Sequence, residues 1–336
     1  MKVGLLMFPS PTGSASMAQL AEGLGFHSLV FADTQCLTPE VWSQLMLAAT
    51  ATEHIQIGPG VTNPVSRDPA VTASAALGLQ VASGGRVVLG IGRGDSSMAK
   101  IGRHPATLAV FEVYLDQLRG YLHGEEVMRG EEHSRIEWLD GVDVPPPPLE
   151  VAATGPKVIE IAARRADRIC FAVGADPDRL KACIKQARAA AAVAGRDPDQ
   201  LEFGAYVNCV IHPDRSEARE AIRGGLSVFA HFSGFHGMDI DSLPEGTRAA
   251  ARYLRSQYDM DNHALASGAH AQALEDEFIH YFGIAGPADE AKERFRELAV
   301  LGLDFVRVIP GSRDMPPGIA APSIQALAEV AKDLSP

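Results

Sequence analysis

Short apolar runs that alternate with longer helical segments constrain the fold of this chain more than any other feature. Eight runs are each followed by a turn signal and, except after the seventh and eighth, promptly by a segment with helical apolar spacing. Such alternation is the signature of βα units around a parallel sheet. The eight predicted strands are Val3–Phe8, Ser28–Ala32, Ile55–Gly58, Arg86–Ile91, Leu149–Ala153, Arg168–Ala172, Leu201–Ile211 and Asp304–Ile309. We therefore predict an α/β fold, a closed (β/α)₈ TIM barrel with insertions.

Residues that favour helix starts support this pattern. Thr38-Pro39-Glu40 places a capping hydroxyl before a proline at the first helical position, and Asp176-Pro177-Asp178 does the same with a carboxylate. Gly286-Pro287 opens a further helix, Ala288–Leu301.

Two segments interrupt the alternation, and we interpret them as insertions in a single domain that spans residues 1–336. The first, about 124–148, follows the predicted helix Leu108–Leu122 and ends in four prolines. The second, about 231–282, is rich in His, Asp and Tyr. Its aromatic residues suggest a partly aromatic wall for a planar or apolar molecule, although core packing of such residues is more common: Phe232, Phe235, Tyr253, Tyr258 and Phe282. Loops that follow the strands build the active site of such a barrel, so an insertion there is a candidate lid or substrate wall. An oligomer contact is the alternative, and a structural role is as well supported for the first insertion.

Charge and residue spacing argue against several classes of function. The chain has 42 acidic and 30 basic residues, a net charge of −12, and no basic stripe, so we expect no nucleic-acid partner. No apolar run reaches the roughly 18 residues that a bilayer span requires, and the N-terminus has no signal-peptide pattern. We therefore expect a cytoplasmic protein with no membrane partner. The four cysteines are isolated and no HxxxH or HxH spacing occurs, so no metal site is predicted.

The segment Gly58–Pro69, with the sequence GPGVTNPVSRDP, is the most informative stretch in the chain. Two glycines and three prolines within it impose an unusual backbone directly after the third predicted strand. A structural turn explains one Gly-Pro pair but not the whole run. We therefore predict that a ligand approaches this backbone closely.

Two further clusters follow the fourth and fifth predicted strands. Gly90–Ser97 does not match the dinucleotide-binding fingerprint, because its third glycine comes too early, but Asp95 and Ser96 could hydrogen-bond a ligand. In Ala152–Lys157 a helix start, the Thr154 hydroxyl and the Lys157 ammonium together form a candidate phosphate cradle. Most helix starts bind no ligand, so the Ala152–Lys157 cluster alone is weak evidence for a phosphate site.

These three segments, together with Phe31–Gln35 at the end of the second strand, resemble the bacterial luciferase-like monooxygenase superfamily over nearly the full length of the chain. The likeness is greatest to its coenzyme F420 branch, the methylenetetrahydromethanopterin reductase-like enzymes. The motif GPGVTNPxxRxP, here Gly58–Pro69, is quite specific for that branch and its flavin-binding relatives. The resemblance implies a luciferase-like barrel that holds FMN or F420 across the strand ends.

The resemblance also implies roles for individual residues. Gly60-Val61 would form a non-prolyl cis peptide behind the cofactor ring, and Asp33 would lie near the catalytic centre. Gly94–Ser96 would flank the ribityl chain, and Ala153–Pro156 would line the phosphate end. The predicted cofactor-binding residues are Gly60, Val61, Thr62, Asn63, Gly92, Gly94, Asp95, Ser96, Ala153, Thr154, Gly155, Pro156 and Lys157.

One departure from the family pattern concerns the proton donor. Many F420 members carry an Asp-His pair at the end of the second strand, whereas this chain has Asp33-Thr34-Gln35. Threonine cannot replace a histidine as a proton donor near neutral pH. The candidate catalytic residues are therefore Asp33, Gln35 as an orienting group, and His263 from the second insertion.

The leading functional hypothesis is a luciferase-like flavin-dependent oxidoreductase, a monooxygenase that uses reduced FMN on a small organic substrate. The alternative is hydride transfer with coenzyme F420 on the same fold, and the choice between the two cofactors is close. Since the chain has no NAD fingerprint, the reduced cofactor would come from a separate flavin or F420 reductase or by exchange with free reduced cofactor. A homodimer is expected by likeness to the family. Two further hypotheses are a cofactor carrier without catalysis and a hydrolase or lyase whose loops bind a substrate phosphate.

Overall fold

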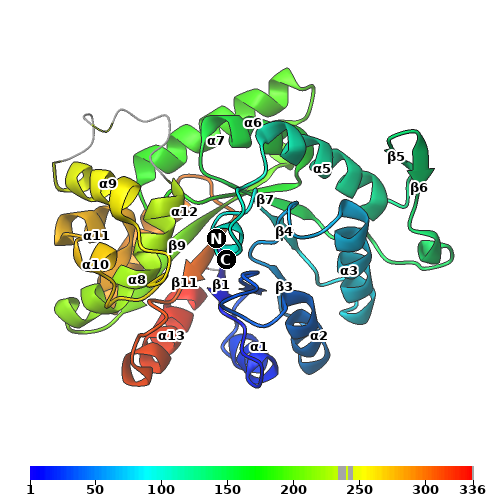
Figure 1. The fold of residues 1–336 in the computed structure, drawn as a ribbon. Helices are drawn as coiled ribbons and strands as arrows, with labels where there is room; N and C mark the ends of the chain where they lie inside the picture. Colours follow the sequence, from blue (N-terminus) through cyan, green and yellow to red (C-terminus); the bar gives the residue numbers. More distant parts are fainter. Residues whose placement is uncertain (234–239, 241–244, 335–336) are drawn as a thin grey trace.

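Eight parallel strands form a barrel in the computed structural model, which describes residues 1–233, 240 and 245–334 (Figure 1). The strands are β1 (Lys2–Met7), β2 (Ser28–Phe31), β3 (Gln56–Pro59), β4 (Leu89–Ile91), β7 (Leu149–Ala153), β8 (Arg168–Phe171), β9 (Glu202–Ile211) and β11 (Phe305–Ile309). Their order is β3-β2-β1-β11-β9-β8-β7-β4, and isolated parallel bridges Ile57–Val87 and Thr62–Ile91 join β3 to β4. The predicted TIM barrel and its eight strands are confirmed.

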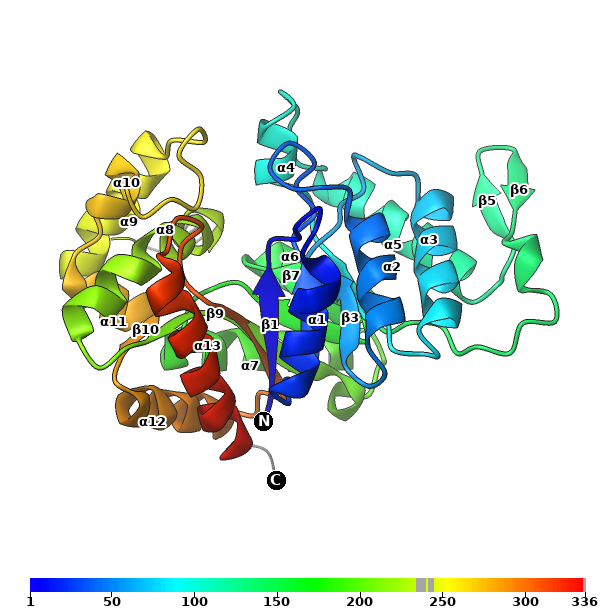
Figure 2. The ribbon, with the colours of Figure 1, turned by 90° about the horizontal axis from the view of Figure 1, so that it is seen from below.

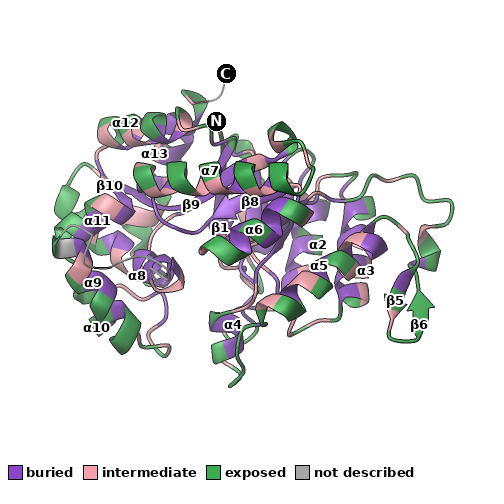
Figure 3. Cartoon of the chain, turned by 90° about the horizontal axis from the view of Figure 1, so that it is seen from above, coloured by how far each residue is buried: buried purple, intermediate pink, exposed green. Residues whose placement is uncertain are grey.

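Helices surround the barrel and cover the outward faces of the strands (Figure 1). The helices that follow the strands are α1 (Ser14–Gly23), α2 (Val41–Ala51), α3 (Pro69–Ala82), α5 (Leu108–Leu122), α6 (Pro156–Arg165), α7 (Pro177–Val193), α8 (Arg215–Ser233) and α13 (Pro317–Lys332), with α12 (Ala288–Ala299) between β10 (Ile284–Gly286) and β11. Outward strand residues such as Leu5, Leu29 and Ile57 are at most 1% exposed, and Figure 3 shows this buried layer between strands and helices. Among the described helices, none combines the length and apolar character of a bilayer span.

The seventh and eighth strands are followed by helices after all, so the predicted exception is wrong. Helix α8 begins at Arg215, soon after β9 ends at Ile211, and α13 begins at Pro317. Both helices are hard to predict from the sequence because they contain residues of low helix propensity, Gly224-Gly225 in α8 and Pro322 in α13. Packing requires the glycine at 224: a Cβ there would lie 2.5 Å from the carbonyl oxygen of Ala264.

The predicted cap of α2 is also wrong, whereas the cap of α7 is confirmed. Helix α2 begins at Val41, and Glu40 caps it by accepting a hydrogen bond from the Ser43 amide at 2.8 Å. The Thr38 hydroxyl instead donates to the carbonyl oxygen of Thr34 at 3.2 Å, because the chain forms an extra turn before the helix. Asp176 accepts from the Asp178 amide at 3.0 Å, as predicted.

The first insertion lies beside the barrel, away from the carboxyl ends of the strands. It forms a hairpin of β5 (Val127–Arg129) and β6 (Glu132–Ser134), followed by the short η1 (Glu137–Leu139). Figure 2 shows the hairpin at the edge of the molecule, next to α3 and α5. None of its described residues lines the cavity at the strand ends.

The second insertion packs against α8 and covers one side of the barrel (Figure 2). Its described elements are α9 (Glu245–Gln257), α10 (Ala269–Gln272) and α11 (Asp276–Phe282). Residues 234–239 and 241–244 lie outside the described part of the chain, so the histidine and the phenylalanine of the insertion at positions 236 and 235 are not placed. The insertion contributes to the cavity, as described below.

A buried ion pair crosses the barrel interior. The Arg307 guanidinium on β11 donates two hydrogen bonds to the Glu150 carboxylate on β7, at 3.0 and 2.7 Å, and a third to the Ser28 hydroxyl on β2 at 2.6 Å. Both charged side chains are 1% exposed. Bidentate geometry of this kind offsets the cost of removing two charges from water. The pair therefore connects three strands across the barrel.

We predict that Glu150→Gln strongly destabilises the protein, because it leaves the Arg307 guanidinium buried without a counter-charge. The free energy of unfolding, measured by urea denaturation, should fall by roughly 3–5 kcal/mol. The matched control is Asp199→Asn in the surface pair Arg188–Asp199, where the aspartate side chain is 81% exposed and the loss should be about 1 kcal/mol or less. Equal losses in the two variants would contradict this role of the buried pair.

Candidate active site

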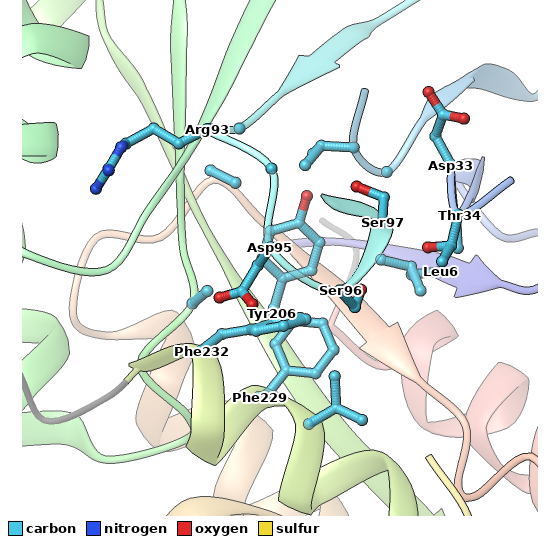
Figure 4. A pocket seen from close by; sticks show the side chains of 18 of the residues that line it. Leu6, Asp33, Thr34, Arg93, Asp95, Ser96, Ser97, Tyr206, Phe229 and Phe232 are labelled. Carbon is cyan, nitrogen blue, oxygen red and sulfur yellow. The ribbon is translucent and has the colours of Figure 1, made fainter. Parts of the chain in front are cut away.

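The carboxyl ends of the strands surround a cavity with about 1310 Å³ of space between protein atoms, part of it open to solvent. Strand ends, the loop after β4 and helix α8 supply its lining (Figure 4). The predicted site residues that line it are Asp33, Gly60, Val61, Gly92, Gly94, Asp95, Ser96, Thr154 and His263. The predicted site residues outside the lining are Gln35, Thr62, Asn63, Ala153, Gly155, Pro156 and Lys157.

One wall of the cavity is backbone with almost no side chain. Gly60 and Gly92 directly follow β3 and β4 and both line the cavity, and the Gly60–Val61 peptide bond is cis, as the family resemblance implies. A Cβ at Gly60 would lie 2.6 Å from the Val30 side chain, and one at Gly92 would lie 2.9 Å from the Val61 side chain. Only glycine fits at these positions, and the result is a bare surface that a flat ring could approach closely.

An ion pair behind this wall holds the Asp33 carboxylate. The carboxylate accepts hydrogen bonds from the Arg67 guanidinium at 2.9 Å and from the Thr62 hydroxyl at 2.8 Å. Arg67 also donates to Glu40 at 2.5 Å. Burial raises the pKa of the Asp33 carboxyl, while Arg67 and Thr62 oppose that shift. Asp33 thus anchors the loop after β3, and Arg67, which belongs to the GPGVTNPxxRxP motif, was missed as a functional residue.

Several predicted residues support the loops from outside the cavity. The Asn63 side chain accepts hydrogen bonds from the amides of Val65 and Ser66, each at 3.0 Å, and is 1% exposed. The exposed Gln35 side chain donates to the carbonyl oxygen of Ser97 at 2.8 Å. Gln35 therefore braces the loop after β4 and does not reach into the cavity.

Only part of the predicted phosphate cradle lines the cavity. Residues alternate along β7 and its extension, so Ala152 and Thr154 face the cavity while Ala153 packs fully buried in the outer core. Pro156 and Lys157 are exposed in the first turn of α6, and Val158 reaches the cavity instead. The Lys157 ammonium is thus not part of the lining, because the helical turn directs it outward.

The opposite wall is apolar and comes from α8. Val228, Phe229 and Phe232 line the cavity, and the Phe229 ring lies 5.4 Å from the ring of Tyr206 on β9. Figure 4 shows the two phenylalanines on the other side of the cavity from Asp33. The sequence analysis predicted an aromatic wall from the second insertion but did not find Phe229 or Tyr206. Helical spacing of apolar residues at 228, 229 and 232 was the available signal.

The other aromatic residues that suggested this wall have different roles. Phe282 is fully buried and stacks on Phe278 at 5.4 Å, whereas Tyr253 is 37% exposed. Tyr258 lies behind the wall and does not line the cavity. Core packing therefore accounts for Phe282, and the cavity uses Phe232 from the predicted set.

His263 is an imidazole that lines the cavity and is only 3% exposed. Its Nδ1 atom lies 2.8 Å from the hydroxyl oxygen of Tyr258. Burial lowers the pKa of His263 to about 4, and the positive charge of Lys100 contributes in the same direction. His263 is therefore neutral at physiological pH. His231 stacks on the Tyr258 ring at 4.0 Å, and His270 lies 4.4 Å from the same ring.

Within the described residues, no group of three or more His, Cys, Asp or Glu side chains is arranged to hold a metal ion. His231, His263 and His270 of the second insertion lie instead around the aromatic ring of Tyr258.

Comparison with known proteins agrees with this architecture. Residues 9–304 match the sequence profile of the luciferase-like monooxygenase family. The chain belongs to this family. It is 30% identical to 5,10-methylenetetrahydromethanopterin reductase of Methanolobus tindarius, over 89% of each chain. It is 32% identical to the F420-dependent hydroxymycolic acid dehydrogenase of Mycobacterium tuberculosis, over 61% of this chain and 60% of the relative.

Solved structures share the luciferase-like fold. Coenzyme F420 dependent tetrahydromethanopterin reductase from Methanopyrus kandleri has a TM-score of 0.74 and 22% identity, over 98% of this chain and 97% of the other. An F420-dependent secondary alcohol dehydrogenase has a TM-score of 0.78 and 19% identity, over 100% and 99% of the two chains. The protein is thus a luciferase-like oxidoreductase built on a TIM barrel.

The low pKa of His263 gives a prediction for acid stability. Between pH 6.5 and about 4 the unfolded chain binds a proton at this histidine and the folded chain does not, so the free energy of unfolding falls as the pH falls. His263→Gln should reduce the slope by up to about 1.4 kcal/mol per pH unit within that window. Urea denaturation at several pH values measures the slope, and the exposed His54→Gln serves as control. An unchanged slope in the His263 variant would refute the neutral, buried state.

Proposed function

We propose that this chain is an F420-dependent oxidoreductase that catalyses hydride transfer to or from a small organic substrate without oxygen. The observation that carries the proposal is the bare backbone wall of Gly60 and Gly92 at the strand ends, which suits a flat tricyclic ring. Two relatives named above support the choice of F420 over FMN. The methylenetetrahydromethanopterin reductase matches 89% of this chain, and the F420-dependent dehydrogenase matches 61% of it. The sequence analysis favoured FMN, and the relatives favour its alternative.

The residues around the cavity fit a deazaflavin cofactor. The ring would lie against Gly60, Val61 and Gly92, where a larger residue than glycine at positions 60 or 92 would collide with Val30 or Val61. Hydroxyl groups of Ser96, Ser97 and Thr154 line the cavity and could hydrogen-bond the ribityl chain and phosphate. When bound, F420 would supply a carbon centre that accepts or donates hydride.

The chain's own residues would bind and orient the cofactor and keep water away from it. Asp33 and Arg67 hold the loop that carries the cis peptide, so the bare wall keeps its shape without the cofactor. Arg93 lines the cavity, and its Nε atom donates to the carbonyl oxygen of Ala106 at 2.6 Å. Its cation is suited to the negative phosphodiester of the cofactor. A homodimer and an external F420 reductase belong to the same proposal.

Separate titrations of the purified protein with F420 and with FMN test the cofactor assignment. We expect F420 to bind at least tenfold more tightly, as measured by quenching of cofactor fluorescence. The reduced cofactor, F420H₂, should be reoxidised by substrate at the same rate under air and under nitrogen. Tighter binding of FMN with oxygen-dependent turnover would replace the proposal by the monooxygenase hypothesis. Binding of F420 without any turnover on a broad substrate panel would favour a carrier, and binding of neither cofactor would favour a hydrolase or lyase.

The bare wall predicts the effect of a single added methyl group. Gly92→Ala places a Cβ 2.9 Å from the Val61 side chain, at the surface where the ring would lie, and should weaken F420 binding at least tenfold. Gly155→Ala is the matched control, because nothing lies within 4 Å of a Cβ at that position and its φ is −119°, which any residue adopts. Equal affinity of the two variants, measured by the same fluorescence titration, would place the ring elsewhere.

A further inference from the structure

The contact between His263 and Tyr258 determines which nitrogen of the imidazole faces the cavity. Burial raises the pKa of the Tyr258 hydroxyl, so this group keeps its proton. The phenol proton needs an acceptor, and Nδ1 of His263 lies 2.8 Å away, while the same hydroxyl also contacts the Ser227 side chain, whose own hydrogen goes to the carbonyl oxygen of Gly224. If Tyr258 donates to Nδ1, the neutral imidazole carries its own hydrogen on Nε2.

The Nε2 atom of His263 is free to meet a ligand. The ring lines the cavity and is 3% exposed, and because Nδ1 contacts Tyr258, which does not line the cavity, Nε2 is the ring nitrogen left for a ligand there. Among the described residues, none forms a hydrogen bond with Nε2, whereas Nδ1 is held by Tyr258. A neutral N–H of this kind offers a hydrogen bond to an oxygen atom without adding a charge to the cavity.

The neighbours of His263 indicate what carries that oxygen atom. The Phe232 ring lies 6.2 Å from the imidazole, and Phe229 lies 5.8 Å from Phe232 on the same face of α8. A ligand oxygen at His263 would therefore be attached to a body that packs against two aromatic rings. Aromatic and aliphatic groups gain most from such a surface, and a charged body gains least.

We propose that His263 is the substrate-binding hydrogen-bond donor of this enzyme, that Tyr258 is its positioning residue, and that the substrate is a carbonyl compound with an apolar substituent. This inference rests on the proposed oxidoreductase function and specifies the substrate side of the same cavity. Phe229 and Phe232 hold the substituent, and the Nε2–H group holds and polarises the carbonyl oxygen. A neutral imidazole performs this task well, because it stays a donor throughout the physiological pH range.

The stacking around Tyr258 makes a precise variant possible. Tyr258→Phe keeps the ring that stacks on His231 and contacts His270, and it removes the hydroxyl that contacts His263. The variant thus tests the positioning role with little change in packing. His263→Leu removes the donor, and His263→Gln offers an amide N–H in its place.

The first test is a ¹⁵N NMR spectrum of the full chain with labelled histidine and no cofactor. We expect the Nε2–H tautomer of His263 in the wild type, and a mixture of the two tautomers in Tyr258→Phe. A wild-type spectrum with the proton on Nδ1 would overturn the proposal. This readout needs neither F420 nor turnover, so it is independent of the cofactor assignment.

The second test compares two ligands of similar shape, acetophenone and isopropylbenzene, of which only the first has a carbonyl oxygen. Binding to the protein with and without F420 is measured by ligand-observed NMR. The wild type should prefer acetophenone about 3- to 10-fold, the usual net value of one hydrogen bond. His263→Leu and Tyr258→Phe should reduce this preference, and His263→Gln should restore part of it.

Phe232→Ala is the matched control, because it should weaken the binding of both ligands by a similar factor and leave the preference unchanged. Circular dichroism verifies that each variant is folded. Equal affinity of the wild type for the two ligands, or an unchanged preference in His263→Leu, would refute the role of His263. If F420 does not bind but the ketone preference follows His263, the cofactor proposal fails and the substrate site stands.

Discussion

The close approach of β3 to β4 is the constraint on which both the barrel and the cavity depend. A Cβ at Gly58 would lie 1.8 Å from the carbonyl oxygen of Val88, and one at Gly90 would lie 2.3 Å from that of Pro59. The strands therefore need glycine at these two positions, and the isolated bridges Ile57–Val87 and Thr62–Ile91 close the barrel on either side of them. The same seam continues into the cis peptide at Gly60 and the bare wall of the cavity. The glycine-rich contact that closes the barrel thus also forms the flat surface of the cavity.

Charged groups inside the barrel are paired across strands that are distant in sequence. Glu150 and Arg307 connect β7 to β11 in the barrel interior, and Asp33 and Arg67 connect the end of β2 to the loop after β3. Each pair removes charges from water, which is costly unless the hydrogen bonds are complete. Arg307 meets this condition with three hydrogen bonds that include both oxygens of Glu150, whereas Asp33 accepts two, both at its Oδ2 atom. Together they hold the interior and the rim of the cavity in a defined geometry.

The cavity combines two walls of different chemistry. The strand ends supply glycine backbone and hydroxyl groups, which suit a polar, planar cofactor, while α8 and the second insertion supply aromatic rings and a neutral histidine. The first wall comes from the strand ends of the barrel, and the second combines α8, the helix that follows β9, with His263 of the second insertion.

The sequence by itself determined the eight strands, because alternation of apolar runs and turns is a local signal that survives into the fold. It also located the glycine-rich segments at the rim, since only glycine permits such backbone contacts. Tertiary structure decided which side chains meet. Arg67 reaches Asp33, and Tyr258 fixes the orientation of His263, through contacts that no local pattern encodes. Lys157 is close to Thr154 in sequence, but its side chain does not line the cavity, because its position in the first turn of α6 directs it outward. Packing around α8 likewise overrode a weak helix propensity and formed the aromatic wall.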